Sequence, residues 1–150
     1  MARAETVRRG QLGELRQVRV EYGQDWLAEP LKASGHKQAD GGTDPARAGA
    51  GGCIGDIGTH AYQLAEYITG MTPTVLCAEL STFVADRAFD DHLQIMLRYA
   101  NGARGTLGAR QVATVHENDL RIAVYGSRGG LRWVQLPAVA PRLDTSRTTR

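Results

Sequence analysis

The sequence has 150 residues, of which 42% are hydrophobic and 23% are charged, and its formal net charge is +2. This length is usual for one domain with its own core, so we expect a single domain over residues 1–150. The sequence shows neither a bilayer-spanning apolar run nor a leader with a charged and then an apolar part. We therefore expect a cytoplasmic location and no membrane partner. The arginines are scattered and mostly alternate with acids, whereas nucleic-acid-binding domains show a basic stripe interleaved with aromatic residues, so no nucleic-acid partner is expected.

The first part of the chain is predicted to hold one helix, one strand and a long loop. "ARAETVRRGQLGE" is typical of the last turns of a helix that ends near Gly10. Residues 15–22, "LRQVRVEY", place two valines and Tyr22 on one side and polar residues on the other, which is the period of a half-buried strand. Residues 29–52 lack periodicity, and loops of this length in compact domains are usually functional.

A helix beginning at Asp56 is the best-defined element of the sequence. The spacing of apolar residues becomes helical at this point, and Gly70 followed by Pro73 is predicted to end the helix. The residues predicted for its buried face are Ile57, Ala61, Leu64, Ala65 and Ile68.

Five strand-like runs follow the helix, and they span residues 74–84, 92–99, 103–113, 120–125 and 131–136. Asn101-Gly102 predicts a two-residue hairpin of type I′, because both central positions of that turn need positive φ, and "GSRGG" at 126–130 predicts a second hairpin. The predicted fold is α+β: an open, predominantly antiparallel sheet of about six strands with helices packed on one face. The strand at 15–22 is expected to pair with the antiparallel meander that the later strands form. The sheet face without helices is expected to be either exposed to solvent or an interface.

The glycines of "GAGGCIG", residues 49–55, have the density of a phosphate-binding loop. Such a loop works only when a buried strand feeds it and a helix N-terminus follows, and "GGTDPARA" before it is no strand. The acid that a dinucleotide site carries about twenty residues later is also missing. We therefore expect the glycines to allow a tight turn or the close approach of a ligand or partner, and not to bind phosphate.

Asp56 and His60 are four residues apart in the first turns of the predicted helix. Their side chains can meet on one face, with the Cβ atoms about 5–6 Å apart. A carboxylate beside an imidazole orients the ring and raises its proton affinity, as a general base requires. The same residues also fit structural roles, with Asp56 as a helix N-cap and His60 as a half-buried histidine.

A metal site is a weaker hypothesis for the same pair. Asp56 and His60 could bind zinc with one further ligand, and the candidates for that ligand are His36, His92 and His116. Nothing in the sequence fixes the distance of these histidines from His60, so no metal is expected. Cys53 and Cys77 are too few for a zinc ribbon or a disulfide framework, and both lie in apolar stretches, where cysteine usually packs as a small hydrophobe.

An aromatic wall is the remaining candidate feature. Tyr22, Asp25 and Trp26 in "EYGQDWL" follow the first strand and could line a site for a polar ligand. Alternatively, Trp26 and Leu27 cap the core.

Several segments together resemble one family. "GGCIGDIGTHAYQLAEYITG", preceded by "VRRGQLGELRQVRVEY" and followed by "DDHLQIMLRYANGARGTL" and "LRIAVYGSRGGLRW", resembles the C-terminal domain of the glucose-fructose oxidoreductase / inositol dehydrogenase family, also called Gfo/Idh/MocA. The resemblance covers about residues 7–133 in the order of the family, and "GG-x-x-x-D-x-G-x-H" is its most specific part.

The resemblance implies an NAD(P)-dependent oxidoreductase that acts on sugars, cyclitols and related hydroxy compounds. In this family an N-terminal Rossmann domain holds the cofactor, and the second domain supplies the substrate site and an open sheet for oligomerisation. Asp56 and His60 match the acid and the histidine of the family, which implies that His60 takes the hydroxyl proton while hydride leaves the carbon. Asp56 would orient His60 or contact the substrate.

Three departures from the family pattern are present. The glutamate-lysine-proline motif has no match, since neither Lys32 nor Lys37 lies in such a context, and the Rossmann glycine loop is also missing. Relatives often carry a tryptophan and an arginine where this chain has Asp40-Gly41-Gly42, which puts the contacts of that loop in doubt.

The resemblance therefore predicts a C-terminal substrate-binding and oligomerisation domain, with the Rossmann domain absent from this chain. NAD or NADP is expected in the full-length protein, with no cofactor bound to this chain alone. The expected partners are a small sugar or polyol and further copies of the chain through the open sheet face. The expected substrate-binding residues are Tyr22, Trp26, Asp56 and His60, of which Asp56 and His60 are also catalytic. The alternative is a catalytically inactive dimerisation or binding module.

Overall fold

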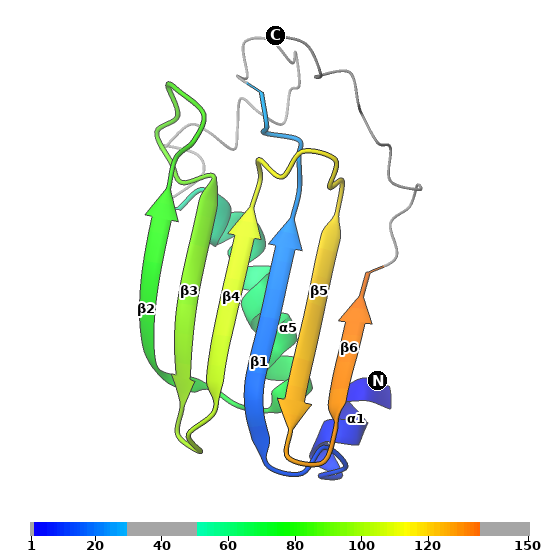
Figure 1. Ribbon diagram of the computed structural model, residues 1–150. Helices are drawn as coiled ribbons and strands as arrows, with labels where there is room; N and C mark the ends of the chain where they lie inside the picture. Colours follow the sequence, from blue (N-terminus) through cyan, green and yellow to red (C-terminus); the bar gives the residue numbers. More distant parts are fainter. Residues whose placement is uncertain (1, 30–50, 136–150) are drawn as a thin grey trace, which may run out of the picture.

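The computed structural model describes residues 2–29 and 51–135 and shows an α+β fold, as predicted (Figure 1). No helix in these two ranges is long and apolar enough to cross a membrane. Most of the predicted loop at 29–52, including His36, Lys32 and Lys37, lies outside the described residues. The elements are α1 (Ala2–Arg8), β1 (Leu15–Gly23), the π-helical segment η1 (Ile54–Gly58), α5 (Thr59–Thr69), β2 (Pro73–Ser81), β3 (His92–Tyr99), β4 (Arg104–Arg110), β5 (Asp119–Gly126) and β6 (Gly130–Val134).

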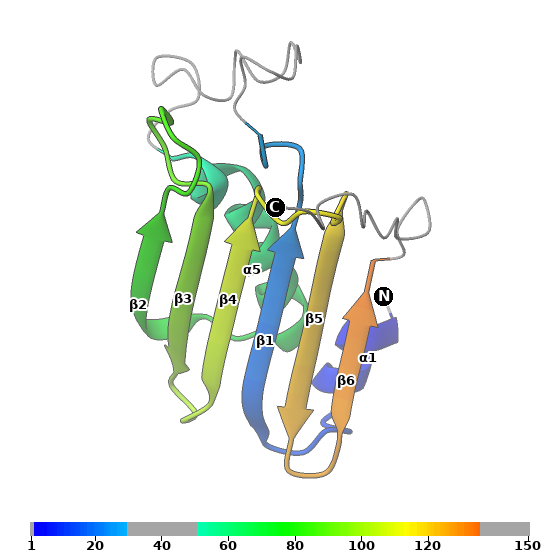
Figure 2. The ribbon, with the colours of Figure 1, turned by 45° about the horizontal axis from the view of Figure 1, so that its top comes forward.

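The strands form one six-stranded sheet in the order β2-β3-β4-β1-β5-β6. β1 lies between β4 and β5 (Figures 1 and 2), so it interrupts the predicted meander instead of extending it. It pairs in parallel with β4, from Gln17 opposite Arg104 to Gly23 opposite Arg110, and antiparallel with β5. The prediction of a predominantly antiparallel sheet is confirmed, since the β1–β4 pair is the one parallel pairing of the described sheet.

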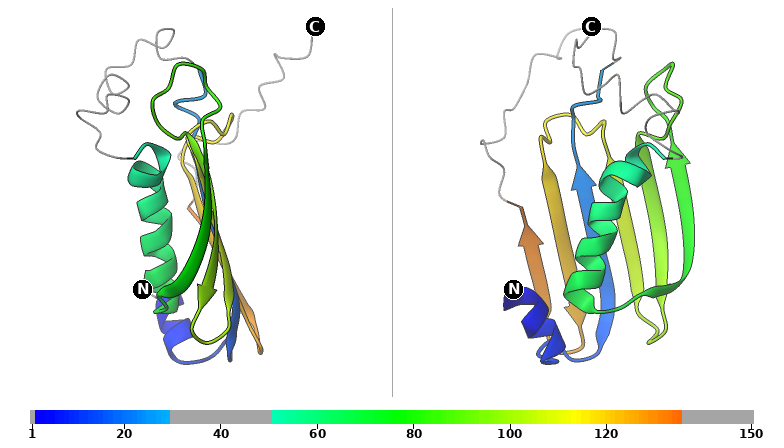
Figure 3. Two further views of the ribbon diagram at one scale, coloured as in Figure 1. Left: turned by 90° about the vertical axis from the view of Figure 1, so that its left-hand side faces the viewer. Right: turned by 180° about the vertical axis from the view of Figure 1, so that it is seen from behind.

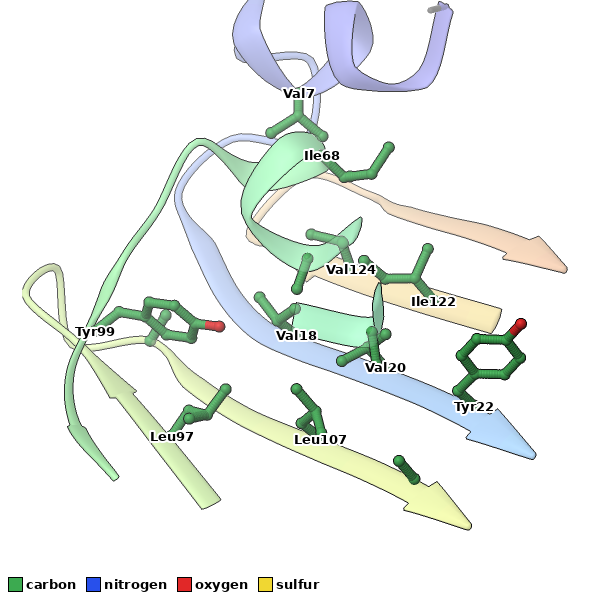
Figure 4. Packing of buried hydrophobic residues seen from close by; sticks show 14 of the residues in the cluster. Val7, Val18, Val20, Tyr22, Ile68, Leu97, Tyr99, Leu107, Ile122 and Val124 are labelled. Atoms are coloured by element: carbon green, nitrogen blue, oxygen red, sulfur yellow. The ribbon is translucent and has the colours of Figure 1, made fainter. Parts of the chain in front are cut away.

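Both described helices cover the same face of the sheet, as predicted (Figure 3). α5 presents Ala61 and Ala65 to the strands, and both are buried. Small side chains at these positions let the helix backbone approach the sheet closely, and Ile57 and Ile68 fill the space at either end. The strand side of this core consists mainly of Val18, Val20, Leu97, Tyr99, Leu107, Ile122 and Val124 (Figure 4).

The predicted chain reversals are present, with one difference in turn type. Gly70 ends α5 in the left-handed conformation, at φ 68°. The Asn101-Gly102 hairpin is also present, but Gly102 has positive φ and Asn101 does not. The Gly102 N–H donates to the Tyr99 carbonyl at 3.0 Å, and the Tyr99 N–H donates to Ala103 at 3.1 Å. This is a three-residue loop with one left-handed glycine, and not the predicted type I′ turn.

The second hairpin joins β5 to β6 at residues 126–130, where it was predicted. The Gly126 N–H donates to the Gly129 carbonyl at 2.8 Å, and Tyr125 pairs with Gly130.

Candidate functional site

Polar side chains gather at the end of the sheet where β1 and β4 finish and the η1–α5 helix begins. Tyr22 is at the end of β1, and its hydroxyl points away from the rest of the core (Figure 4). Gln111 directly follows β4, and Asn118 directly precedes β5. Because β1 runs parallel to β4 and antiparallel to β5, the last residues of β1 and β4 and the first of β5 meet at one edge. Asp56 and His60 reach the same edge from the helix.

The segment that carries Asp56 is π-helical, whereas the sequence predicts an ordinary helix beginning at Asp56. η1 starts at Ile54 and continues without a break into α5 at Thr59. Ile57 and Gly58 are buried against the sheet, while Asp56 and His60 are exposed. A π-helix has more residues per turn than an α-helix, so a π-helical turn changes the direction of the side chains it carries. Such turns are frequent at functional sites.

The N-terminus of this helix is capped by Asp90, which lies just before β3. The Asp90 carboxylate accepts from the Gly52 N–H at 3.0 Å and from the Ile54 N–H at 2.8 Å. The Asp90 carbonyl accepts from the Cys53 N–H at 2.9 Å. Asp56 is therefore not the N-cap, and that structural alternative for it is wrong.

The same capping bears on the glycine loop. The exposed N–H groups of a helix N-terminus are what would hold a phosphate, and here the Asp90 carboxylate already occupies the N–H groups of Gly52 and Ile54. A Cβ atom on Gly52 would lie 2.3 Å from the Asp90 carbonyl oxygen and 2.6 Å from Cβ of Phe89. The glycine thus permits close approach, as expected, but to the chain's own backbone. Residues 51–55 do not fit the phosphates of a nicotinamide cofactor.

Asp56 is held by Gln111, and His60 lies beside Tyr22. The Gln111 Nε2–H donates to Asp56 Oδ2 at 2.7 Å. The rings of His60 and Tyr22 meet edge to face, with 6.4 Å between their centroids. Within residues 2–29 and 51–135, no hydrogen bond or ion pair joins Asp56 to His60, so the direct contact that a four-residue spacing allows is not made.

Gln111 is fixed by bonds on both sides of its backbone, and its side chain is buried. Its N–H donates to the Asp91 carbonyl at 2.9 Å, and its carbonyl accepts from the Leu27 N–H at 3.1 Å. A buried amide held in this way gives the Asp56 carboxylate one defined orientation. Gln111 bonds to one Asp56 carboxylate oxygen. The other oxygen has no hydrogen-bond partner among the described residues, so it is free to bind a ligand.

The side chains of Tyr22 and Trp26 belong to one hydrogen-bonded network. Asn118 Oδ1 accepts from the Tyr22 hydroxyl and, at 3.2 Å, from Gln24 Nε2–H. The Trp26 indole N–H donates to Gln24 Oε1 at 2.8 Å. Trp26 is half-buried, whereas Leu27 is buried, so the core-capping alternative holds for Leu27.

Tyr22 is kept as a neutral phenol. Burial raises its pKa, a hydrogen bond from Gln24 lowers it, and the nearby Asp56 charge raises it, with a net shift above the ordinary value of 10.0. At neutral pH the hydroxyl is therefore a hydrogen-bond donor and not a base.

A second acid holds the loop between β2 and β3 at this end of the sheet. Asp91 is fully buried and accepts from the N–H groups of Phe83 and Val84 at 2.9 and 3.0 Å. Arg87 donates to Asp91 at 3.1 Å and also to the carbonyl of Leu27. The ion pair thus connects this loop to the segment that carries Trp26.

The structure does not support the metal hypothesis in the described ranges. No group of three or more metal-binding side chains is found in them. Two of the candidate ligands have other neighbours. His92 packs against Phe83, with ring centroids 5.3 Å apart, and His116 Nε2 lies 3.4 Å from Asp119 Oδ2. The third candidate, His36, is outside the described residues.

No pattern in the sequence singles out Gln24, Gln111 and Asn118, and none assigns a specific role to Asp90 or Asp91. Amide side chains carry no pattern of their own. For Asp90 and Asp91 the sequence does hold a signal, which is the pair of consecutive acids in "DDH" at the start of a strand. Buried acids need hydrogen-bond or ion-pair partners, so this pair indicates a structural role.

Comparison with known proteins identifies similar sequences and structures. A family model described as "GFO/IDH/MocA C-terminal domain" matches residues 2–132. The chain is 29% identical over 131 residues to the uncharacterized oxidoreductase YfiI of Bacillus subtilis, covering 85% of this chain and 33% of that protein. It is 27% identical over 148 residues to levoglucosan dehydrogenase of Pseudarthrobacter phenanthrenivorans, covering 83% of this chain and 36% of that protein.

A similar structure is also known. The crystal structure of an inositol dehydrogenase homolog complexed with NAD+ from Azotobacter vinelandii matches with a TM-score of 0.81 and 27% identity, over 87% of this chain and 34% of that chain. The chain spans about a third of the length of these three proteins.

Proposed function

The chain belongs to the GFO/IDH/MocA family, and on that premise we propose that it is the substrate-binding domain of an NAD(P)-dependent oxidoreductase acting on a sugar, polyol or cyclitol hydroxyl. The observation that carries the proposal is the gathering of His60, Asp56 and the Tyr22 network at one end of the sheet. The names of the similar proteins, a levoglucosan dehydrogenase and an inositol dehydrogenase homolog, support this substrate class.

In this proposal His60 is the general base. Its imidazole is exposed and has no hydrogen-bond or ion-pair partner among residues 2–29 and 51–135, so a ring nitrogen is free to accept the proton of a substrate hydroxyl. The Tyr22 ring restricts the His60 ring from one side. Asp56, which Gln111 orients, binds a neighbouring hydroxyl with its free oxygen.

Tyr22 and Trp26 form one wall of the substrate site. Ligand sites combine apolar ring surfaces with a few placed polar groups, and the network supplies both through these rings and the amides of Gln24 and Asn118. A sugar or polyol presents C–H faces to the rings and hydroxyls to the amides.

The cofactor belongs to another domain in this proposal. Residues 51–55 do not fit its phosphates, because Asp90 fills the helix N-terminus. The NAD+ complex of the inositol dehydrogenase homolog supports a nicotinamide cofactor, which supplies the hydride acceptor. The chain's own contribution is the proton transfer and the binding of the substrate.

The sheet face without helices is the proposed contact between copies of the chain. Figure 3 shows that both described helices lie on the opposite face. Met96 from β3, Tyr125 from β5 and Val134 from β6 are exposed and supply apolar surface.

The test is NAD(P)+-dependent oxidation of levoglucosan and inositol by the protein that carries both domains. The His60→Gln variant should lose about 10²–10⁴-fold in kcat, the range that general-base catalysis contributes. The matched control is His116→Gln, because the His116 ring pairs with Asp119 and makes no hydrogen bond or ion pair with Tyr22, Asp56 or His60 among the described residues, and it should retain full activity. Equal activity of the two variants would remove His60 from the mechanism. Absence of turnover by the unsubstituted protein would favour a binding module without catalysis.

A further inference from the structure

One ion pair of the described residues is buried on both sides, and it joins Arg87 to Asp91 in the β2–β3 loop. The two side chains are 5% and 0% exposed, and the Arg87 Nη1–H donates to Asp91 Oδ2 at 3.1 Å. In every other ion pair of residues 2–29 and 51–135, both side chains are at least 21% exposed. Figure 1 shows that this loop lies at the end of the sheet where β1 and β4 finish, which is the end that carries the proposed site.

Stability alone does not account for a buried pair of this kind. Taking two charges out of water costs about as much free energy as their attraction returns, so a buried ion pair adds little net stability. The Nε–H group of Arg87 is also buried and has no hydrogen-bond partner in the described ranges, which is a further cost. The remaining bonds of Arg87 point to a geometric role.

The Nη2 nitrogen of Arg87 holds the segment that follows Trp26. Its N–H groups donate to the carbonyl of Leu27 and, at 3.2 Å, to the carbonyl of Glu29. On the other side of Trp26, the backbone of Gln24 is bonded to the end of β4. Trp26 therefore lies between two fixed points, and Arg87 supplies the second of them.

Asp91 connects the same loop to the residue that orients Asp56. The Asp91 carbonyl accepts from the Gln111 N–H at 2.9 Å, and the Gln111 side chain donates to Asp56 at 2.7 Å. The Gln111 carbonyl accepts in turn from the Leu27 N–H at 3.1 Å. One loop thus connects the segment of Trp26 to the support of Asp56.

We propose that Arg87 is a positioning residue of the substrate site, which holds the Trp26 ring in the place where it contacts a sugar or polyol. This inference rests on the function proposed above. Within the described ranges Arg87 has no hydrogen bond or ion pair with Asp56 or His60, so its effect passes through the two backbone carbonyls. Arginine suits this role because its planar fork bonds to several acceptors in fixed directions, whereas a lysine ammonium is a point charge on a flexible chain.

The first test follows the NMR signals of the indole N–H groups in Arg87→Lys. This substitution keeps a positive charge for Asp91 but removes the fork. The chain has two tryptophans, so the second one, Trp133 on β6, is an internal reference. We expect the Trp26 signal to shift or broaden and the Trp133 signal to stay unchanged.

The matched control is Arg128→Lys. Arg128 also donates to a backbone carbonyl, that of Gly10, but it lies in the β5–β6 hairpin at the opposite end of the sheet (Figure 1). This variant should leave the Trp26 signal unchanged.

The second test is the steady-state kinetics of this domain together with the proposed cofactor domain. Arg87→Lys should raise the KM for the polyol about three- to tenfold and leave kcat unchanged, because it weakens a contact made equally in the ground state and the transition state. A merely structural role would lower kcat through loss of folded enzyme and leave KM unchanged. Thermal unfolding of each variant shows that it is folded. If Arg87→Lys does not fold, Arg87→Gln replaces it, since its amide keeps a donor and brings no ammonium into the buried site.

Two results would overturn the proposal: an unchanged Trp26 signal in Arg87→Lys, or a displaced Trp26 signal with an unchanged KM. Absence of turnover by the unsubstituted protein would instead count against the proposed function. The Trp26 signal would then still decide whether Arg87 holds this segment, because it is measured without catalysis.

Discussion

Cys53 and Cys77 differ in environment although both lie in apolar stretches of the sequence. Cys53 is fully buried, and its pKa is raised to about 12, first by burial and then by the charges of Asp90, Asp56 and Asp91. The prediction that cysteine packs as a small hydrophobe is confirmed for Cys53. It is wrong for Cys77, which is exposed on the edge strand β2.

This difference predicts selective alkylation. Because the thiolate is the nucleophile, iodoacetamide at neutral pH should modify Cys77 in the native protein and leave Cys53 unmodified. Mass spectrometry of peptides gives the site of modification, and the unfolded protein in urea is the control in which both thiols should react. Equal rates for the two thiols in the native protein would contradict the buried position of Cys53.

At the scale of elements, the start of the η1–α5 helix is determined by residues far away in the sequence. The periodicity of apolar residues is sufficient to predict the helix and its end at Gly70. Its earlier start and π-helical first turn are not predictable in this way, because the Asp90 carboxylate that caps the helix is 36 residues from Ile54. The sequence next to Ile54 therefore shows no N-cap residue, because the capping carboxylate comes from Asp90 in the β2–β3 loop.

Two glycines of this segment provide a matched pair for testing the capping contact. Gly52→Ala should destabilise the fold by about 1–3 kcal/mol, the usual cost of overpacking, because the new Cβ would lie 2.3 Å from the Asp90 carbonyl oxygen. Gly55→Ala has nothing within 4 Å of its new Cβ and should be neutral or stabilising, by up to about 1 kcal/mol. Urea unfolding of both variants measures the difference. A Gly52→Ala protein as stable as Gly55→Ala would exclude the close approach of Gly52 to Asp90.

At the scale of the whole molecule, the strands were predictable but their order was not. The alternation of apolar residues in 15–22 shows that one face of this strand is buried, and it carries no information about which strands pair at its edges. In the structure both edges of β1 are paired, one with β4 and the other with β5. A chain-order meander would leave this strand at the edge of the sheet.

The central position of β1 predicts its hydrogen-exchange behaviour. Amides of Val18 and Val20 should be among the slowest to exchange, since they lie in the middle of the sheet under α5. Amides of β2 and β6, the two edge strands, should exchange faster. Native-state exchange followed by NMR gives these rates, and fast exchange throughout β1 would place it at an edge.

The order of strands also explains how much of the site the sequence could reveal. His60 and Asp56 lie four residues apart in one helical segment, so the sequence alone places both at the start of that segment. Gln111 and Asn118 reach Asp56 and Tyr22 only because β1 lies between β4 and β5. A local pattern cannot contain that information, and the amide residues were missed for this reason.

The most direct measurement is a crystal structure of this domain together with the proposed cofactor domain, with NAD+ and a bound polyol. We predict that the hydroxyl to be oxidised lies about 2.6–3.2 Å from a ring nitrogen of His60, with the polyol beside Tyr22 and Trp26 and one hydroxyl on Asp56. A polyol bound elsewhere, with His60 beyond hydrogen-bonding distance of its reacting hydroxyl, would contradict the assignment of this site.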